Sequence, residues 1–366
     1  MNVCIYQGMH LLRQFMSLDW HDKCLCILEL ILSRMEMGFR VLLGVLICLT
    51  LASCEAPLVL DGVEQARKQA IHRTDRIQAA ASLGDDVLLA GIGFILNSSD
   101  GAKTWKREQP EDMPSFIGAA ICPNGLQAAV SAEKQVWISS DNGEAWQANN
   151  LGTEEAPQFI SCGPNNKLWV AASFSTLLSS IDQGETWQQT TFDEDLIFTY
   201  VKFFDQLNGV IVGEFGSVYT TEDGGENWLL KEEHVPNEFF PLAVSFLDRQ
   251  HGWIGGSSGV IFYTEDGGDS WEKEQTGSIA PIYGLSASEL GVYAVGDFGT
   301  LLERRAVNNS VPRWHRSTAV STRFYLRAIT PLGEDKVILG GGAGTLQSLI
   351  NDGSGKLVVV NEKEGE

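Results

Sequence analysis

Positive charge is scarce in this sequence. Its 366 residues include 26 Lys and Arg against 47 Asp and Glu, which gives a formal net charge of −21 at pH 7. A protein that binds nucleic acid needs a positive surface to neutralise phosphates. The acidic balance therefore excludes nucleic acid as an expected partner.

Residues that commonly bind metals or perform catalysis are also few. The chain has six His, and those beyond residue 54 show no spacing typical of metal ligands. The Gly-x-x-Gly turns, such as Gly256–Gly259, lead into expected strands, so they lack the helix N-terminus that holds phosphate. Nucleophile-elbow and Ser/His/Asp spacings are absent as well. We therefore expect no catalytic residues, no metal and no cofactor.

Most of the seven cysteines lie near the N-terminus, where one of them ends an export signal. Residues 37–54 combine one Arg with an apolar run that is too short to span a membrane, and they end in Leu51-Ala-Ser-Cys54. This ending resembles the bacterial lipobox, in which the cysteine is lipidated. We predict a lipoprotein signal peptide over 37–53 and a lipidated Cys54. The alternative is an ordinary signal peptide with a cysteine at its cleavage site.

The segments on either side of this signal lack a repeat. Residues 1–36 show no second export pattern, which indicates a start assigned too early and a segment outside the mature protein. We interpret residues 54–75 as a tether that holds the rest of the chain away from the membrane.

A repeated phrase that ends in tryptophan dominates the remaining sequence. Five aspartates are spaced 41, 41, 41 and 43 residues apart, and a Trp follows each of them five positions later. A fixed period near 40 residues indicates repeated supersecondary units. The pairs are Asp100 and Trp105, Asp141 and Trp146, Asp182 and Trp187, Asp223 and Trp228, and Asp266 and Trp271.

Each unit contains the pattern of four short strands. Glycine turns lead into β-branched or aromatic runs such as Val260–Tyr263, and two further apolar runs precede each turn, as in Leu326–Ile329 and Lys336–Leu339. Seven such turns occur. We predict an all-β fold, a seven-bladed β-propeller of four-stranded antiparallel blades over residues 76–366, with Leu357–Val360 as its last outer strand. An open solenoid is the competitor, but its repeats are usually shorter.

Cys122 and Cys162 fall at equivalent points of neighbouring units. An exported protein can form a disulfide between them. However, we expect equivalent strands of adjacent blades to diverge, and free cysteine is a common small buried residue. The sequence favours two free thiols and leaves the pairing open.

The aspartate of the repeated phrase suits a turn better than an active site. Its side chain can accept backbone N–H groups, the Gly two positions later in most copies can take a positive φ, and the Trp can cover the hairpin. Copies spread around a ring also cannot converge on one substrate. We therefore interpret all five pairs as structural, with weak calcium binding as the alternative.

The phrase Ser/Thr-x-Asp-x-Gly-x-Thr-Trp resembles the Asp-box, or BNR repeat, of sialidases, sortilin-like receptors and photosystem II stability and assembly factors. A sialidase would be expected to carry an Arg-Ile-Pro element and three convergent arginines, whereas the first unit offers only Arg73 and Arg76. Repeats such as Val210–Trp228 and Gly256–Trp271 are more similar to the assembly factor family.

This resemblance implies a non-enzymatic propeller that binds membrane protein subunits during the assembly of a complex. It also implies an exported protein, held on the membrane through lipidated Cys54 and facing the periplasm, or the thylakoid lumen in a photosynthetic organism. The alternatives are an extracytoplasmic sialidase-type glycoside hydrolase and an outer-membrane lipoprotein scaffold for a transporter.

One stretch of the sequence is positively charged, although the chain as a whole is acidic. Residues 301–330 contain six arginines and a single acid, Glu303, for a local charge of +5. We predict a partner-binding patch on the sixth and seventh blades that recognises acidic segments, with Arg323 and Arg327 on one face of a strand. The alternative is that the arginines neutralise nearby acids. The six are Arg304, Arg305, Arg313, Arg316, Arg323 and Arg327.

Overall fold

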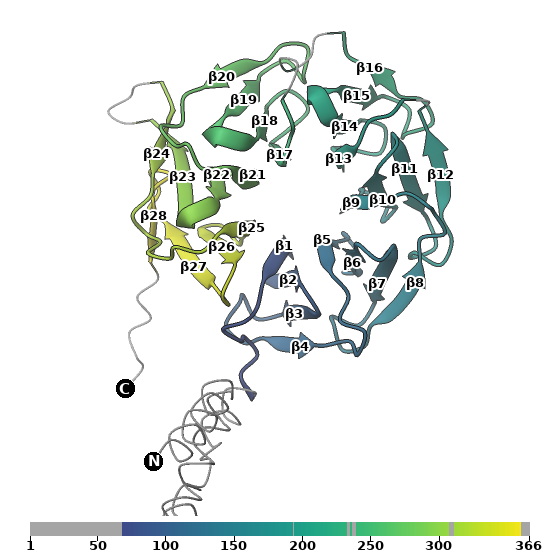
Figure 1. Ribbon diagram of the computed structural model, residues 1–366, viewed down its shortest axis with the longest axis horizontal. Coiled ribbons are helices and arrows are strands. Elements are labelled where there is room, and N and C mark those ends of the chain that lie inside the picture. Colours follow the sequence, from purple (N-terminus) through teal and green to yellow (C-terminus); the bar gives the residue numbers. More distant parts are fainter. Residues whose placement is uncertain (1–67, 193, 233–234, 236–238, 307–310, 360–366) are drawn as a thin grey trace, which may run out of the picture. The chain divides into compact units, whose positions relative to one another are not determined.

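The computed structural model describes residues 68–192, 194–232, 235, 239–306 and 311–359. Within these residues, seven four-stranded antiparallel sheets follow one another along the chain and form a ring (Figure 1). The prediction of a seven-bladed propeller is confirmed. The predicted signal peptide 37–53, Cys54 and residues 1–36 lie outside the described residues. No helix in the described part of the chain is long and apolar enough to cross a membrane.

The first four blades use strands of two to seven residues. They are β1 Ile77–Leu83, β2 Asp86–Gly91, β3 Phe94–Ser98 and β4 Lys106–Glu108; β5 Phe116–Ile121, β6 Gln127–Ser131, β7 Gln135–Ser139 and β8 Gln147–Asn150; β9 Pro157–Cys162, β10 Leu168–Ala172, β11 Thr176–Ser180 and β12 Gln188–Thr191; β13 Phe198–Phe203, β14 Gly209–Gly213, β15 Val218–Thr221 and β16 Leu229–Leu230.

The last three blades have the same order. They are β17 Ala243–Phe246, β18 Gly252–Gly255, β19 Ile261–Thr264 and β20 Glu272–Glu274; β21 Ile282–Ser288, β22 Gly291–Gly296, β23 Thr300–Arg305 and β24 Arg313–Arg316; β25 Leu326–Leu332, β26 Lys336–Gly341, β27 Leu346–Asn351 and β28 Leu357–Val359. Three 3₁₀ turns join second to third strands: η1 Glu214–Gly216, η2 Ser257–Gly259 and η3 Asp297–Gly299.

The position of a strand within its blade explains its composition. The second strands β6, β10, β14 and β18 are buried along their whole length, because they have a strand on each side and a blade against each face. They are therefore rich in small and β-branched residues, and β10 and β18 each add a buried Trp. The outermost strand β12 is exposed throughout and reads Gln-Gln-Thr-Thr. The hydrophobic core thus lies between the blades.

The ring closes between the first and last blades. Strand β1 packs beside β25, and the Gly344 N–H in the seventh blade donates to the Asp75 carbonyl at 2.9 Å. The buried Asp75 carboxylate pairs with Arg107 of β4 at 2.8 Å. Ala70 and Ile71 pack against the same core. The end of the predicted 54–75 tether is therefore part of the folded body, because a buried ion pair holds it at the closure.

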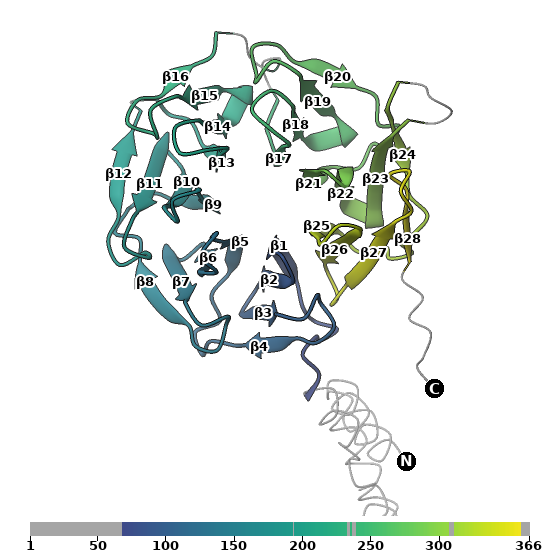
Figure 2. The same cartoon turned by 180° about the vertical axis from the view of Figure 1, so that it is seen from behind.

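Cys122 and Cys162 form a disulfide, with their Cα atoms 5.1 Å apart. The expectation of two free thiols was wrong. Blades diverge toward the rim, but the two cysteines stand at the ends of β5 and β9, which are innermost strands and lie side by side next to the axis. Seen from behind, the innermost strands surround the centre of the ring (Figure 2).

The antiparallel order of each blade gives the ring two ends. Turns between first and second strands and between third and fourth strands share one end, which we call the Asp-box face. Turns between second and third strands and the connections between blades share the other. We call this second end the aromatic face, because Phe174, Phe215 and Phe298 lie in its turns.

Candidate partner-binding faces

Each Asp-box closes on its own hydrogen bonds, as the third copy illustrates. The Asp182 carboxylate accepts the Thr186 N–H at 3.0 Å and the Thr186 hydroxyl at 2.5 Å. The Ser180 hydroxyl donates to Asp182 at 2.7 Å and accepts the Gly184 N–H at 2.8 Å. Gln183 and Gly184 have φ values of 61° and 83°, so two successive residues are left-handed. The box is a compact turn.

These hydrogen bonds stabilise the charged carboxylates. Bonds from the Thr186 side chain and backbone lower the pKa of Asp182 to about 2. Bonds from the Asn227 backbone and side chain lower the pKa of Asp223 to about 2 as well. Asp100, Asp141 and Asp266 accept equivalent bonds from their own turns. Among the described residues, no cluster of three or more His, Cys, Asp or Glu could hold a metal ion.

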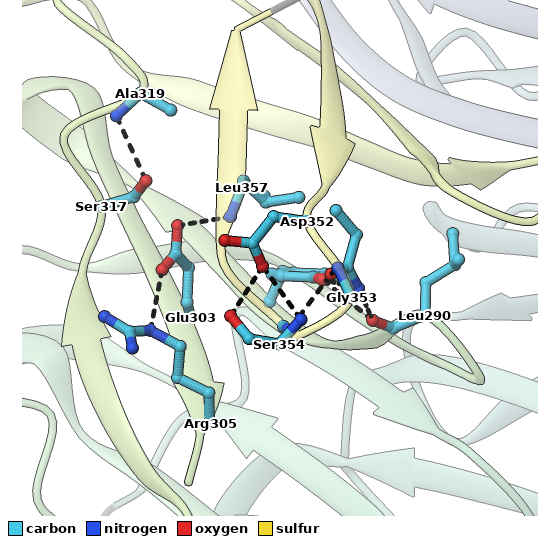
Figure 3. Close-up of polar contacts among 12 residues, drawn as sticks. Leu290, Glu303, Arg305, Ser317, Ala319, Asp352, Gly353, Ser354 and Leu357 are labelled. Carbon is cyan, nitrogen blue, oxygen red and sulfur yellow. Dashed lines mark hydrogen bonds and ion pairs between the residues drawn. The ribbon is translucent and has the colours of Figure 1, made fainter. Parts of the chain in front are cut away.

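The seventh blade keeps the turn with different residues (Figure 3). The Asn351 side-chain oxygen accepts the Gly353 N–H at 2.8 Å and the Gly355 N–H at 3.1 Å. These donors lie two and four positions later, which matches the amides that Ser98 accepts in the first box. Asn351 therefore replaces the Ser or Thr of the box, and the Asp position is occupied by Gly353. In the sixth blade, residues 307–310 lie outside the described residues.

Arg304 forms an ion pair with a carboxylate of the neighbouring blade. Its guanidinium contacts the Glu274 carboxylate of β20 at 2.8 and 2.9 Å, and it lies 5.0 Å from the ring centre of Tyr263. Glu274 also accepts the Trp314 indole N–H at 2.8 Å. Arg304 therefore joins the fifth and sixth blades and satisfies a carboxylate that is only 17 % exposed.

Arg305 is paired as well, with a carboxylate that joins the sixth and seventh blades (Figure 3). The Glu303 side chain is 2 % exposed. It accepts the Arg305 Nε–H at 3.2 Å and the Leu357 backbone N–H of β28 at 3.0 Å. This arrangement agrees with neutralisation of nearby acids for Arg304 and Arg305.

The six arginines do not form one surface. Arg304, Arg305 and Arg313 lie where β23 ends and β24 begins, toward the Asp-box face, whereas Arg316, Arg323 and Arg327 lie toward the aromatic face. The prediction that Arg323 and Arg327 share a strand face was wrong, because β25 begins at Leu326 and Arg323 belongs to the connection before it. The antiparallel blade separates residues that are close in sequence.

Three phenylalanines are exposed in turns of the aromatic face. Phe174, Phe215 and Phe298 are 55, 52 and 68 % exposed, and their φ values are 50°, 55° and 55°. A bulky residue in this left-handed region is a strained outlier, and an exposed aromatic ring gains little from burial. Exposed apolar residues in the connections between blades add to this end: Met113, Phe240, Ile279 and Phe324.

From their glycines, these turns are predicted only as boundaries between strands. In Gly213-Glu-Phe-Gly216 and Gly296-Asp-Phe-Gly299, the Phe occupies a position that favours Gly or Asn. An aromatic residue at that position of a repeated turn is a readable signal, since it costs backbone energy without contributing to a core. The equivalent turns of the fifth and seventh blades carry Ser258 and Ala343, with φ values of 59° and 54°.

Part of the repeat region is similar to a known family. The family described as "Photosynthesis system II assembly factor YCF48" matches residues 182–281. The photosystem II assembly protein Ycf48 of Thermosynechococcus vestitus is 27% identical over 176 residues, which cover 46% of this chain and 50% of that protein. The resemblance to the photosystem II assembly factor family is confirmed. The chain thus spans about half the length of the curated relatives it matches.

A second relative is named as a lipoprotein. The photosystem II assembly lipoprotein Ycf48 of Prochlorococcus marinus (strain MIT 9312) is 27% identical over 172 residues, covering 44% of this chain and 49% of that protein. Among solved structures, "YCF48 bound to D1 peptide" has a TM-score of 0.62 at 17% identity and covers 76% of this chain and 93% of that chain.

The same ring also occurs in an enzyme. A virginiamycin B lyase from Staphylococcus aureus has a TM-score of 0.63 at 10% identity, covering 75% of this chain and 94% of that chain. At such identities the likeness shows the fold alone. The propeller architecture therefore does not separate an enzyme from a binding protein, and the side chains on its faces must do so.

Proposed function

We propose that this chain is a non-enzymatic propeller that binds a membrane protein subunit and supports the assembly of its complex. The observation that carries the proposal is the set of exposed phenylalanines Phe174, Phe215 and Phe298. Exposed aromatic residues that share one end of a molecule are typical of protein-binding surfaces. Their left-handed turns hold the rings at strained positions, as is common where function constrains a backbone.

The relatives support the choice of a partner. They are named as photosystem II assembly proteins, and one solved relative is described as bound to a D1 peptide. We infer that the aromatic face of this chain takes a peptide segment of a comparable membrane subunit. A sialidase-type hydrolase and a transporter scaffold remain the alternatives, but neither is named among these relatives.

The placement of the protein is also part of the proposal. Relatives named as lipoproteins support an exported protein anchored through a lipid at Cys54, with 37–53 as the signal peptide. The anchor would hold the propeller near the membrane where the subunit is inserted. We propose the periplasmic side, or the thylakoid lumen if the organism is photosynthetic.

A binding assay with a D1 peptide tests the function. The purified propeller should bind a fluorescent D1 peptide, and Phe174→Ala, Phe215→Ala and Phe298→Ala combined should weaken this binding at least tenfold, since aromatic anchors dominate such interfaces. The matched control is Ile181→Ala, which removes an 84 % exposed apolar residue from the Asp-box face. Unchanged affinity of the folded triple variant would refute the aromatic face as the binding surface.

A further inference from the structure

A ring of displaced residues surrounds the mouth of the central channel. In six of the seven blades the register between first and second strands shifts at the second residue of the first strand. Such a bulge leaves one residue unpaired and redirects its side chain, and bulges are frequent beside functional sites. The residues skipped by the pairing are Gln78, Ile117, Gln158, Thr199, Tyr283 and Arg327.

All six skipped residues line one cavity. The cavity has a volume of about 300 Å³ and is bounded by the innermost strands of all seven blades. Because each skipped residue is the second of its strand, and each of these strands starts at the aromatic face, the ring lies at the mouth on that side. The mouth therefore opens on the end of the ring whose turns carry the exposed phenylalanines.

Arg327 is the only charged residue among the described residues that line this cavity. Its guanidinium makes no hydrogen bond or ion pair with any described residue, unlike Arg304 and Arg305, which each have a carboxylate partner. The surrounding strands partly desolvate Arg327 and lower its pKa, but a guanidinium stays protonated in proteins. The channel therefore holds a positive charge that no described carboxylate pairs with.

The other polar side chains of the ring are mostly engaged. The Gln78 amide donates to the Tyr325 hydroxyl at 2.7 Å, the Gln158 amide donates to the Ala156 carbonyl at 3.3 Å, and the Thr199 hydroxyl donates to the Val212 carbonyl at 3.3 Å. Tyr283 lies near Arg327, and its hydroxyl has no partner among the described residues. Among the described side chains of this ring, the guanidinium of Arg327 and the phenol of Tyr283 are therefore donor groups that line the cavity and have no hydrogen-bond partner.

We propose that Arg327 is the receptor for a carboxylate on a partner segment that enters the channel from the aromatic face. The proposal rests on the proposed protein-binding function and specifies what its partner must carry. A planar guanidinium binds a carboxylate through two parallel N–H···O bonds, and a phenol can donate a third. The net charge of −21 would repel an acidic segment elsewhere, so a cation without a carboxylate partner at the mouth also selects where the segment docks.

An affinity selection with defined peptide mixtures tests this site. Three mixtures of random neutral octapeptides serve as probes: one with a free C-terminal carboxylate, one with a C-terminal amide, and one amidated but carrying a single internal Glu. Bound peptides are identified by mass spectrometry. We expect the folded propeller to enrich at least one carboxylate mixture tenfold or more over the neutral amides, as a charge-assisted bidentate contact would do.

Substitutions of Arg327 test whether this side chain causes the preference for carboxylates. Arg327→Gln should abolish the enrichment, and Arg327→Lys, which keeps the charge but loses the fork, should reduce it at least threefold. Arg323→Gln is the matched control, because Arg323 is exposed at the same end but does not line the cavity. Enrichment of the free acid alone identifies a chain end as the ligand, and enrichment of the Glu peptides identifies a side chain.

Three results would overturn the proposal: no enrichment of either carboxylate mixture, equal enrichment of neutral amides, or an unchanged preference in both folded Arg327 variants. The outcome is separable from that of the D1 peptide assay. A propeller that binds the D1 peptide through its phenylalanines but shows no carboxylate preference keeps the proposed function and loses this site. A propeller that selects carboxylates through Arg327 but does not bind the D1 peptide keeps this site and loses the proposed function.

Discussion

The two ends of this propeller use their side chains in opposite ways. At the Asp-box face, the polar groups of the turns bond to one another, and the Cys122–Cys162 disulfide joins two blades. At the aromatic face, Phe215 and Phe298 are exposed in strained turns, and the Arg327 guanidinium at the channel mouth has no partner in the part of the chain that the structure describes. The contrast agrees with a division of roles in which the repeated motif maintains the fold, and it supports our proposal that positions which vary between blades bind the partner.

Removing the disulfide is the most severe way to weaken the Asp-box face. Cys122→Ala combined with Cys162→Ala should lower the free energy of unfolding by about 2–4 kcal/mol, because the unfolded chain regains the freedom of a closed loop of about 40 residues. Urea unfolding measures the effect. Reduced wild-type protein should match the variant. Equal stability of the oxidised protein and the variant would contradict this role.

One buried hydroxyl tests the hydrogen bonds of a box. Ser139 is 1 % exposed, and its hydroxyl accepts the Gly143 N–H at 2.9 Å. Ser139→Ala leaves that N–H without its acceptor and should cost about 1–3 kcal/mol of unfolding free energy. The adjacent Ser140 is exposed, so Ser140→Ala is the matched control and should have little effect. Similar losses from both substitutions would argue against the hydrogen-bonded turn.

Acid should lower the stability that the Asp-box carboxylates contribute. The pKa values of Asp182 and Asp223 are about 2 in the folded protein, below the ordinary value of 3.8. Between these values the unfolded chain binds more protons than the folded one, so stability is complete above about pH 4 and falls as the pH drops toward 2. Thermal unfolding measured from pH 7 to pH 2.5 gives the dependence of the unfolding temperature on pH. The double variant Asp182→Asn with Asp223→Asn should lose less stability than the wild type over this range. An equal loss in both proteins would show that these two carboxylates do not cause the acid sensitivity.

The architecture could be predicted from the sequence because each blade carries its own turn chemistry. Asp182 and Trp187 mark a hairpin through bonds to residues at most four positions away, so their period directly counts units. The disulfide could not be predicted in this way, since it depends on how close β5 and β9 come beside the axis.

The candidate site was also only partly readable. Six arginines in one stretch suggested a single patch, but the antiparallel blade places Arg304 and Arg327 at opposite ends. Arg304 is paired with Glu274, which comes from another blade 30 residues earlier. The bulge that turns Arg327 into the channel is a property of strand register, and no local pattern shows it. The exposed Phe298 could have been predicted from the sequence, because an aromatic residue within a glycine turn strains the backbone and adds nothing to the core.

We propose that the aromatic face gives up stability in order to bind a partner, and a double substitution of its phenylalanines separates the two properties. Phe215→Gly with Phe298→Gly removes two rings from left-handed positions, where Gly is favoured by up to about 1 kcal/mol per site. Ser258→Gly makes the same backbone change in the equivalent turn of the fifth blade, where no ring is lost. Unfolding by urea and binding of the D1 peptide are measured on the same preparations.

We expect both variants to be at least as stable as the wild type. Ser258→Gly should bind the peptide normally, and the double phenylalanine variant should bind it at least tenfold more weakly. A folded double variant with wild-type affinity would show that these rings are not the binding surface.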